Sequence, residues 1–345
     1  MLLWALPFLI MAAVVLADVL TGPTIGLMPL FSLGPAFAAV FYGLRSTILI
    51  GAVALALCVV DTFTLENGLS ARQETLAVVT VAGVTAAAVI ASVARQRRER
   101  ELADVSTIAE VAQHVVLRPV PTRAGPLAFA VRYLSAAAHA QIGGDLYEVM
   151  PGPEGTVLIV GDVQGKGLAA VQTAATVLGT FRAAAEDEAD LEAIACRIEA
   201  SLGRQLPSEE FVTAVLAHVS PDGSKALLLN CGHPPPLLLA PGKPARPAEP
   251  VAPSLPLGLA DLAGEPRDAT TVALAPGEAL LFYTDGISEA RDRGGAYYPL
   301  TAGCAALDWR EPGAALDRLR ADVLRHVGHP LEDDAALLLL TRPED

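Results

Sequence analysis

The sequence predicts an α+β domain that follows an all-α, apolar N-terminal region. Three observations lead to this prediction. Most of the charged residues lie after residue 94, strand-like and helix-like segments alternate after residue 119, and short acidic segments adjoin the apolar runs of this second part. The 345 residues are enough for about two domains.

The first 94 residues are predicted to form about four transmembrane helices. The apolar stretches are Leu2–Leu20, Ile25–Leu44, Thr47–Thr62 and Glu74–Ala94. Each is close to the ~20 residues that a helix needs to cross a bilayer, although the third is short. The first stretch could instead be the core of a signal peptide, but no basic segment precedes it.

Basic residues after the fourth stretch predict the orientation of this region. Arg95, Arg97, Arg98 and Arg100 form a cluster that should stay in the cytoplasm. Four crossings then place both termini there, so we expect a multi-pass protein of the cell membrane with a cytoplasmic C-terminal domain. The four cysteines (Cys58, Cys196, Cys231, Cys304) show no paired metal-binding spacing.

The overall charge disfavours one class of partner. The formal net charge is −14, and most of it lies after residue 94. Such a domain has no general electrostatic attraction for nucleic acid. We therefore expect no nucleic-acid partner.

A linker helix is predicted between the membrane region and the second domain, within residues 95–118. Apolar residues recur at helical spacing in the segment Arg95–Val116, at Val105, Ile108, Ala112 and Val115. This narrow stripe could pair weakly in a homodimer or could lie on its own domain. Pro119 and Pro121 should end the helix.

The domain 119–345 is predicted to contain two sheets of mainly antiparallel strands, because hairpin-length turns join several of them. The predicted strands are Phe129–Leu134, Asp145–Val149, Val157–Val160, Phe211–Val219, Lys225–Cys231, Pro236–Leu239, Thr270–Leu274, Ala279–Tyr283 and Ala335–Leu340. The predicted helices are Leu168–Ala185, Ala189–Leu206 and Gly313–Val327. The proline-rich segment 241–256 should form an irregular loop.

Four acidic segments are the most informative feature of this domain: Gly143-Gly144-Asp145, Gly161-Asp162-Val163, Thr284-Asp285-Gly286 and Asp333-Asp334. Three of them adjoin predicted core strands, where a carboxylate is costly unless a partner neutralises it. Few basic residues lie nearby in the sequence. Hard divalent cations with oxygen ligands are the economical explanation, and two ions sharing a water would make a hydrolase of phosphate esters. Ordinary Asp-Gly turns are the alternative.

The order of these segments resembles a known family, the SpoIIE/RsbU-like branch of the PPM (PP2C-type) serine/threonine phosphatases. The segments that carry the resemblance are Ile142–Tyr147, Gly161–Gly167, Asn230–Pro236, Pro256–Leu259, Tyr283–Ala290 and Asp333-Asp334. The resemblance extends from about Ile108 to Leu340. Residues 1–94 lie outside it.

The resemblance implies an α-β-β-α sandwich, a metal-dependent phosphatase activity and a set of ligands for two Mg²⁺ or Mn²⁺ ions. Asp162 is expected to bridge the ions with help from the Val163 carbonyl, Asp145 to serve the second ion, and Asp285 with Asp333 to serve the first. The nucleophile is expected to be a metal-bound water and not a side chain. The implied substrate is a phosphorylated protein, with a STAS-type anti-anti-sigma protein of a partner-switching pathway as one candidate.

Some residues depart from the family pattern or keep two interpretations. Gln164 stands where eukaryotic relatives have a histidine suited to proton donation, and an amide cannot titrate. Ala336 replaces a Ser or Thr that many relatives have, which leaves Asp334 as an alternative to Asp333. Lys166 could contact phosphate or be solvated, and His233 could line the site or hold a turn. Gly144 is a further candidate site residue, and Gly165 with Gly167 predicts a tight turn into a helix.

Two other functions are consistent with parts of the sequence. Gly143-Gly144-Asp145 is similar to the start of a diguanylate cyclase signature, but Leu146-Tyr147 follows where that signature has Glu-Phe. A catalytically inactive phosphatase-like receptor or scaffold is the stronger rival. A scaffold, however, has no electrostatic reason to keep uncompensated acids together.

Overall fold

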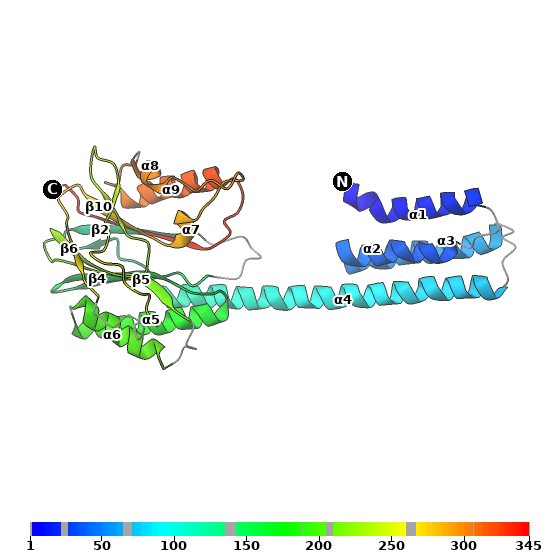
Figure 1. Cartoon of the computed structure of the whole chain (residues 1–345), viewed down its shortest axis with the longest axis horizontal. Helices are drawn as coiled ribbons and strands as arrows, with labels where there is room; N and C mark the ends of the chain where they lie inside the picture. Colours follow the sequence, from blue (N-terminus) through cyan, green and yellow to red (C-terminus); the bar gives the residue numbers. More distant parts are fainter. Residues whose placement is uncertain are drawn as a thin grey trace. The chain divides into compact units, whose positions relative to one another are not determined.

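The computed structural model describes residues 2–21, 27–64, 71–134, 143–188, 190–204, 210–259, 267–305 and 307–344. The chain divides into two compact units, Met1–Asp104 and Val105–Asp345 (Figure 1). The long helix α4 (Ala71–Val116) contributes residues to both units. It contains the fourth predicted membrane stretch and the predicted linker helix in one uninterrupted element.

The first unit is all-helical. Before α4 it contains α1 (Leu2–Thr21), the 3₁₀ helix η2 (Met28–Ser32), α2 (Leu33–Phe41) and α3 (Leu44–Thr64). Met11, Met28 and Phe31 are among the buried side chains that pack its interior. Within the second predicted membrane stretch, the described residues thus include a 3₁₀ helix followed by a short α-helix.

One helix among the described residues is long and apolar enough to cross a membrane. It is the part of α4 at Arg72–Glu99, with a mean hydropathy of 2.3. Shorter apolar helices lie at Ala5–Asp18, Met28–Phe41 and Leu44–Val60. The predicted loop between the third and fourth stretches includes residues 65–70, which lie outside the described residues.

The second unit is built on two antiparallel sheets. The six-stranded sheet has the order β1 (Arg123–Ala124), β2 (Leu127–Leu134), β11 (Ala335–Thr341), β10 (Ala279–Tyr283), β7 (Leu237–Leu239) and β8 (Arg246–Pro247). The five-stranded sheet has the order β3 (Leu146–Gly152), β4 (Gly155–Val163), β5 (Val212–Val219), β6 (Lys225–Cys231) and β9 (Thr270–Ala273).

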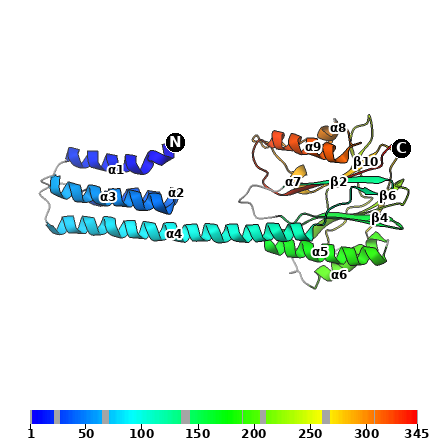
Figure 2. The same cartoon turned by 180° about the vertical axis from the view of Figure 1, so that it is seen from behind.

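Helices cover the outer face of each sheet (Figure 2). The pair α5 (Leu168–Asp187) and α6 (Leu191–Leu202) packs on the five-stranded sheet. On the other side, α8 (Leu300–Ala305) and α9 (Pro312–Val327) pack on the six-stranded sheet, and α7 (Asp285–Ser288) is a single turn after β10. The predicted second helix was longer than α6, and its predicted residues 189, 205 and 206 lie outside the described residues.

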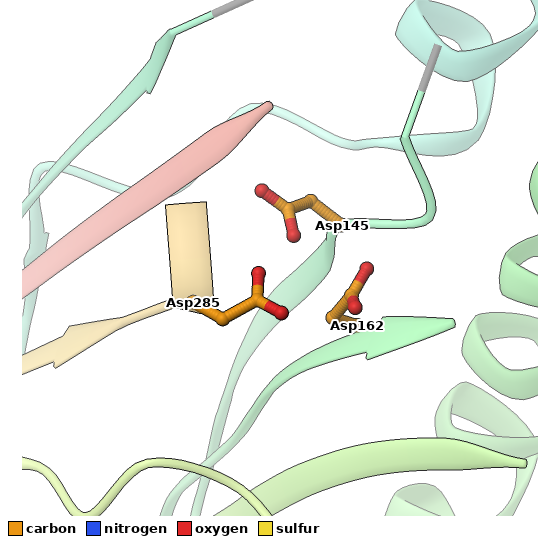
Figure 3. A group of neighbouring side chains, drawn as sticks. All are labelled: Asp145, Asp162 and Asp285. Atoms are coloured by element: carbon orange, nitrogen blue, oxygen red, sulfur yellow. The ribbon is translucent and has the colours of Figure 1, made fainter. Parts of the chain in front are cut away.

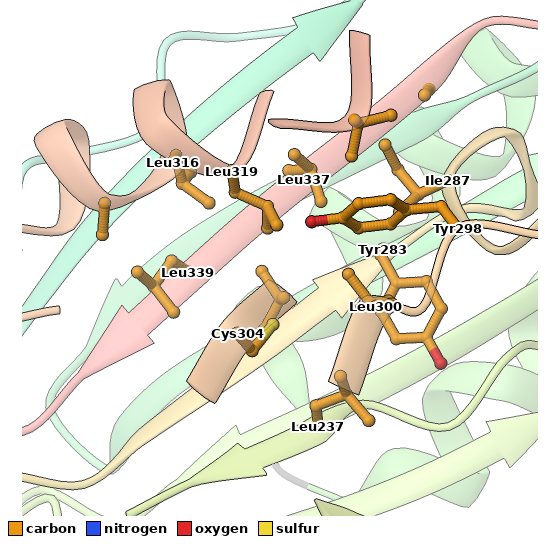
Figure 4. Close-up of a cluster of buried hydrophobic side chains, with 14 of the residues drawn as sticks. Leu237, Tyr283, Ile287, Tyr298, Leu300, Cys304, Leu316, Leu319, Leu337 and Leu339 are labelled. Carbon is orange, nitrogen blue, oxygen red and sulfur yellow. The ribbon is translucent and has the colours of Figure 1, made fainter. Parts of the chain in front are cut away.

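Alternate side chains of the central strands enter different cores, as the pleat requires. Leu337 and Leu339 of β11 face α9 and share a core with Leu316 and Leu319 of that helix (Figure 4). The residues between and after them, Leu338 and Leu340, belong to the core between the two sheets. Both faces of the strand are therefore buried, which explains why its sequence is a continuous apolar run. The layers confirm the α-β-β-α sandwich.

Candidate metal centre

The ends of four central strands meet at one edge of the sandwich. In the five-stranded sheet, Leu146 pairs with Gly161, which brings Asp145 beside Asp162. In the six-stranded sheet, β10 pairs with β11 up to Tyr283 opposite Leu337, which places Thr284 and Asp285 beside the start of β11. Residues distant in sequence thus meet because antiparallel registers bring the relevant strand ends together.

Three carboxylates from both sheets converge there (Figure 3). One oxygen of each of Asp145, Asp162 and Asp285 lies within 4.8 Å of the others. Asp145 is buried at 2% exposure, and the other two are half-buried. The acidic segments therefore form a common site and are not merely separate Asp-Gly turns.

The electrostatics of this cluster favour a cation. Burial, reinforced by the charge of Asp162, raises the pKa of Asp145 well above its ordinary value. Burial and the charges of Asp285 and Asp333 raise the pKa of Asp162 to about 7. The pKa of Asp285 is also raised, again mainly by burial. Three carboxylates that resist joint ionisation become compatible when a divalent cation binds, and an all-oxygen donor set suits Mg²⁺ or Mn²⁺.

The two consecutive acids before β11 have different surroundings. Asp333 is 44% exposed at its side chain and lies 2.8 Å from the Lys166 amino nitrogen. It lines the same pocket as Asp162 and Asp285. Asp334 is buried, and its Oδ2 accepts hydrogen bonds from the Tyr133 hydroxyl and from the Gly143 N–H, each at 2.7 Å. Asp334 thus holds the segment that leads to Asp145 and does not line the pocket.

The pocket has a volume of about 260 Å³, and Gly144, Val163 and Lys166 also line it. A Cβ atom on Gly144 would lie 2.5 Å from the Val163 carbonyl oxygen, far closer than contact distance. The absence of a side chain at Gly144 is therefore what allows the start of β3 to approach the end of β4.

Lys166 lies in the tight turn that the glycines predicted. Gly165 and Gly167 have φ values of +99° and +83°, and α5 begins directly afterwards. Lys166 and Asp333 also border a second, larger hollow of about 660 Å³, which is formed with residues 286–295 and 327–332. Lys166 is thus the basic group at the boundary between the metal pocket and this hollow.

His233 lies behind the pocket. It is 5% exposed, with Nε2 at 3.1 Å from the Tyr283 carbonyl oxygen and Nδ1 at 3.0 Å from the Thr213 hydroxyl. A carbonyl only accepts hydrogen bonds, so Nε2 carries the proton and Nδ1 accepts from Thr213. Burial lowers the pKa of His233 to about 4, which keeps the ring neutral. Of the two interpretations open from the sequence, the contacts favour a structural role.

Two residues near the site carry contacts that sequence reasoning missed. Gln113, near the end of α4, donates its side-chain amide to the Tyr133 hydroxyl at 2.7 Å and to the Gly143 carbonyl at 3.3 Å. Nothing in the sequence pattern signals contacts between residues so distant in the chain. Thr284 was noted only as a neighbour of Asp285, although its hydroxyl hydrogen-bonds to Asp145. A hydroxyl residue directly before an acidic strand end is the signal that could have found it.

Solved structures with the same fold come from several bacteria. A Mycobacterium tuberculosis structure of RsbU and RsbW domains is 26% identical, with a TM-score of 0.54, over 64% of this chain and 61% of that one. The PP2C phosphatase domain of SpoIIE from Bacillus subtilis, with a fragment of its regulatory domain, is 18% identical, with a TM-score of 0.56, over 64% of each chain. The chain therefore spans less than two thirds of these two structures.

A third structure is covered almost completely. The SiaA-PP2C domain of Pseudomonas aeruginosa is 18% identical, with a TM-score of 0.57, over 73% of this chain and 99% of that one. The sequence model of the family described as Stage II sporulation protein E (SpoIIE) matches residues 152–343. Asp162, Asp285 and Asp333 lie inside this match, and Asp145 precedes it.

The sandwich with an acidic cluster at the strand ends defines a domain of the PP2C phosphatase class. The family match and the acidic cluster indicate a metal-dependent protein phosphatase domain, a hydrolase. Since the family match covers more than half of the chain, the protein belongs to the SpoIIE family.

Proposed function

We propose that this protein is a membrane-tethered phosphatase that hydrolyses phosphoserine or phosphothreonine in a protein substrate with two Mg²⁺ or Mn²⁺ ions. The observation that carries the proposal is the convergence of Asp145, Asp162 and Asp285, from both sheets, to within 4.8 Å. Such an arrangement is costly for the fold alone, because burial raises the pKa of all three carboxyls and neighbouring acidic charges raise it further.

Each residue has a proposed role in holding the ions. Asp162, with the Val163 carbonyl, would hold both ions, Asp145 would hold the second ion, and Asp285 with Asp333 would hold the first. Two observations support this assignment. Asp162, Val163, Asp285 and Asp333 line one pocket, and an Asp145 oxygen lies within 4.8 Å of oxygens of Asp162 and Asp285. When bound, the two ions supply an activated water and positive charge for the phosphoryl oxygens.

Lys166 has a proposed role at the boundary of the pocket. Its amino group is placed to attract the phosphate, while the larger hollow beside it offers room for residues that flank the phosphorylated side chain. The carboxamide of Gln164 lines the pocket but cannot supply a proton. Protonation of the leaving group is therefore assigned to water.

The proposed pathway is partner switching. The Mycobacterium tuberculosis relative combines RsbU and RsbW domains. By this likeness and the resemblance of the motifs, the proposed substrate is a phosphorylated STAS-type anti-anti-sigma protein. The narrow apolar stripe predicted along the linker supports a homodimer as the working assembly.

The proposed location is the cell membrane, with several crossings and a cytoplasmic phosphatase domain. The apolar part of α4 and the apolar helices before it support the tether. The cluster of Arg95, Arg97, Arg98 and Arg100 supports a cytoplasmic position for the phosphatase domain.

The test is metal-dependent hydrolysis of p-nitrophenyl phosphate by the purified full-length protein. We expect activity with Mn²⁺ or Mg²⁺, its loss with EDTA and its return when the metal is restored. Asp162→Asn and Asp285→Asn should each lower turnover by at least ~100-fold, because the amide keeps the shape and removes a charge that holds an ion. Both variants should keep the thermal unfolding profile of the metal-free protein.

The same experiment separates the enzyme from an inactive receptor or scaffold. A wild-type protein that binds Mn²⁺ but releases no phosphate would indicate the scaffold. Turnover within a few-fold of wild type in both variants would reject the site assignment.

A further inference from the structure

Thr284 occupies a position between the two sheets at the metal centre. It follows the last residue of β10, directly precedes Asp285 and is fully buried. Its hydroxyl donates a hydrogen bond to Oδ2 of Asp145 at 2.9 Å. The same hydroxyl accepts a hydrogen bond from the Ala336 N–H at 2.8 Å.

These two bonds fix the direction of the hydroxyl. The hydroxyl has one proton, which it donates to Asp145, and one of its oxygen lone pairs accepts the N–H of Ala336 in β11. The Thr284 N–H also donates to the Ala336 carbonyl oxygen at 3.1 Å, so the threonine is bound to β11 through both backbone and side chain. These bonds to β11 therefore hold the Thr284 hydroxyl in a fixed position relative to Asp145.

A second set of hydrogen bonds, through His233, holds the backbone directly before Thr284. The Tyr283 carbonyl, one residue before Thr284, accepts a hydrogen bond from Nε2 of His233, whose Nδ1 contacts Thr213 of β5. Thr213 is the register partner of Asp162. The segment Tyr283-Thr284 is thus connected to both strand ends of the five-stranded sheet that carry acids of the cluster.

The Asp145 carboxylate depends on this contact for its orientation. Asp145 precedes β3, and a carboxylate can rotate about its Cβ–Cγ bond unless a hydrogen bond holds one oxygen. The bond from Thr284 to Oδ2 supplies that restraint. It also reduces the cost of ionising a fully buried acid that faces other carboxylates. Groups that orient a metal ligand in this way commonly set metal affinity.

We propose that Thr284 is a positioning residue of the metal centre, whose hydroxyl holds the Asp145 carboxylate in the orientation that binds the cation. The proposal rests on the proposed function, since it assigns Asp145 as a ligand. It predicts that the hydroxyl, and not the bulk of the threonine, determines affinity for the ion.

The test compares threonine variants in the full-length protein, with the dissociation constant for Mn²⁺ measured by calorimetric titration of the metal-free protein. Thr284→Val keeps the shape and removes the hydroxyl, so Mn²⁺ binding should weaken by about 10- to 100-fold. Thr284→Ser restores the hydroxyl and should bind within about threefold of wild type. The control is Thr341→Val, at the other end of β11, where the buried hydroxyl contacts only the Ala128 carbonyl among the bonds described. It should leave binding unchanged.

A structural role alone gives a different result. It predicts lower thermal stability for Thr284→Val with an unchanged Mn²⁺ dissociation constant, and that outcome would overturn the proposal. If Thr284→Val does not fold, Thr284→Ala, which also lacks the hydroxyl but adds no methyl group beside the Ala336 N–H, provides the same comparison with Thr284→Ser.

Mn²⁺ binding by wild type and by Asp162→Asn separates this proposal from the proposed function. If Asp162→Asn loses Mn²⁺ binding while the variants without the Thr284 hydroxyl keep it, the metal centre stands and Thr284 is only structural. If wild type binds no Mn²⁺, the metal centre and this proposal fall together.

Discussion

At the scale of single residues, the direction of a side chain decides which acids form the site. Asp333 and Asp334 are neighbours, yet one lines the pocket and the other bonds to Tyr133 and Gly143 behind it. The sequence predicted an acidic pair at this position, and only the family resemblance favoured the first of the two. The contact between Thr284 and Asp145 joins residues 139 positions apart, so the local sequence could mark Thr284 as a candidate but could not identify its partner.

His233 provides a prediction about pH. Burial disfavours the charged imidazolium and lowers the folded pKa of His233 from its ordinary value of 6.5 to about 4. As the pH falls through 6.5, the unfolded chain takes up a proton that the folded chain does not. Stability from this group is therefore complete above pH 6.5 and is lost as the pH falls toward 4. The shift corresponds to about 3 kcal/mol of unfolding free energy.

The measurement is urea unfolding of the full-length protein between pH 7 and pH 4, followed by the fluorescence of Trp309 after Trp4→Phe. His233→Gln should be less stable than its parent at pH 7 and should lose less stability on acidification, by up to about 3 kcal/mol. His218→Gln, on β5, is the control and should follow the parent. If the unfolding free energies of His233→Gln and its parent fall equally between pH 7 and pH 4, the ring is not held neutral.

At the scale of elements, the sequence predicted the central strands best. Strands such as β11 are buried on both faces and form continuous apolar runs in the sequence, so their existence and their positions along the chain could be predicted. The two-residue strands β1 and β8 were missed, because two residues carry no periodicity. The sequence also could not give the registers that bring the strand ends together, since pairing depends on contacts far along the chain.

Gly144 tests whether the approach of two strands sets the metal centre. In Gly144→Ala, the new Cβ would meet the backbone of Val163 at 2.5 Å from its oxygen and 2.8 Å from its nitrogen. Backbone atoms cannot move aside as a flexible side chain can, so the start of β3 must shift away from β4. We expect Mn²⁺ binding to weaken by at least ~10-fold in a calorimetric titration.

The control for this substitution is Gly179→Ala, within α5. A Cβ there would meet no atom within 4 Å, and alanine in place of glycine should stabilise the helix by about 0.5–1 kcal/mol. Metal binding should stay at the wild-type value. If Gly144→Ala binds Mn²⁺ as tightly as Gly179→Ala, the close contact between the two strands does not determine the geometry of the site.

At the scale of the whole molecule, the apolar unit (Met1–Asp104) and the phosphatase unit (Val105–Asp345) were predictable to different degrees. The phosphatase unit leaves several independent signals in the sequence: strand periodicity, turn residues and acidic strand ends. The apolar unit leaves only hydropathy, which shows that a segment avoids water and does not show whether it crosses a bilayer. To this the structure adds that α4 is one unbroken helix with residues in both units.

The last prediction concerns the number of crossings. The basic cluster from Arg95 to Arg100 predicts a cytoplasmic C-terminus, and four crossings would put the N-terminus on the same side. The critical segment is the second, where η2 and α2 have 5 and 9 residues. At about 2.0 Å per residue for the 3₁₀ helix and 1.5 Å for the α-helix they span about 24 Å, less than the ~30 Å of a bilayer core. Reporter fusions at each terminus and in the predicted loop Leu65–Arg72 measure the outcome. We expect cytoplasmic signals from both termini and an external signal from the loop. Termini on opposite sides would mean that the second segment does not cross, so that the catalytic domain comes after three crossings.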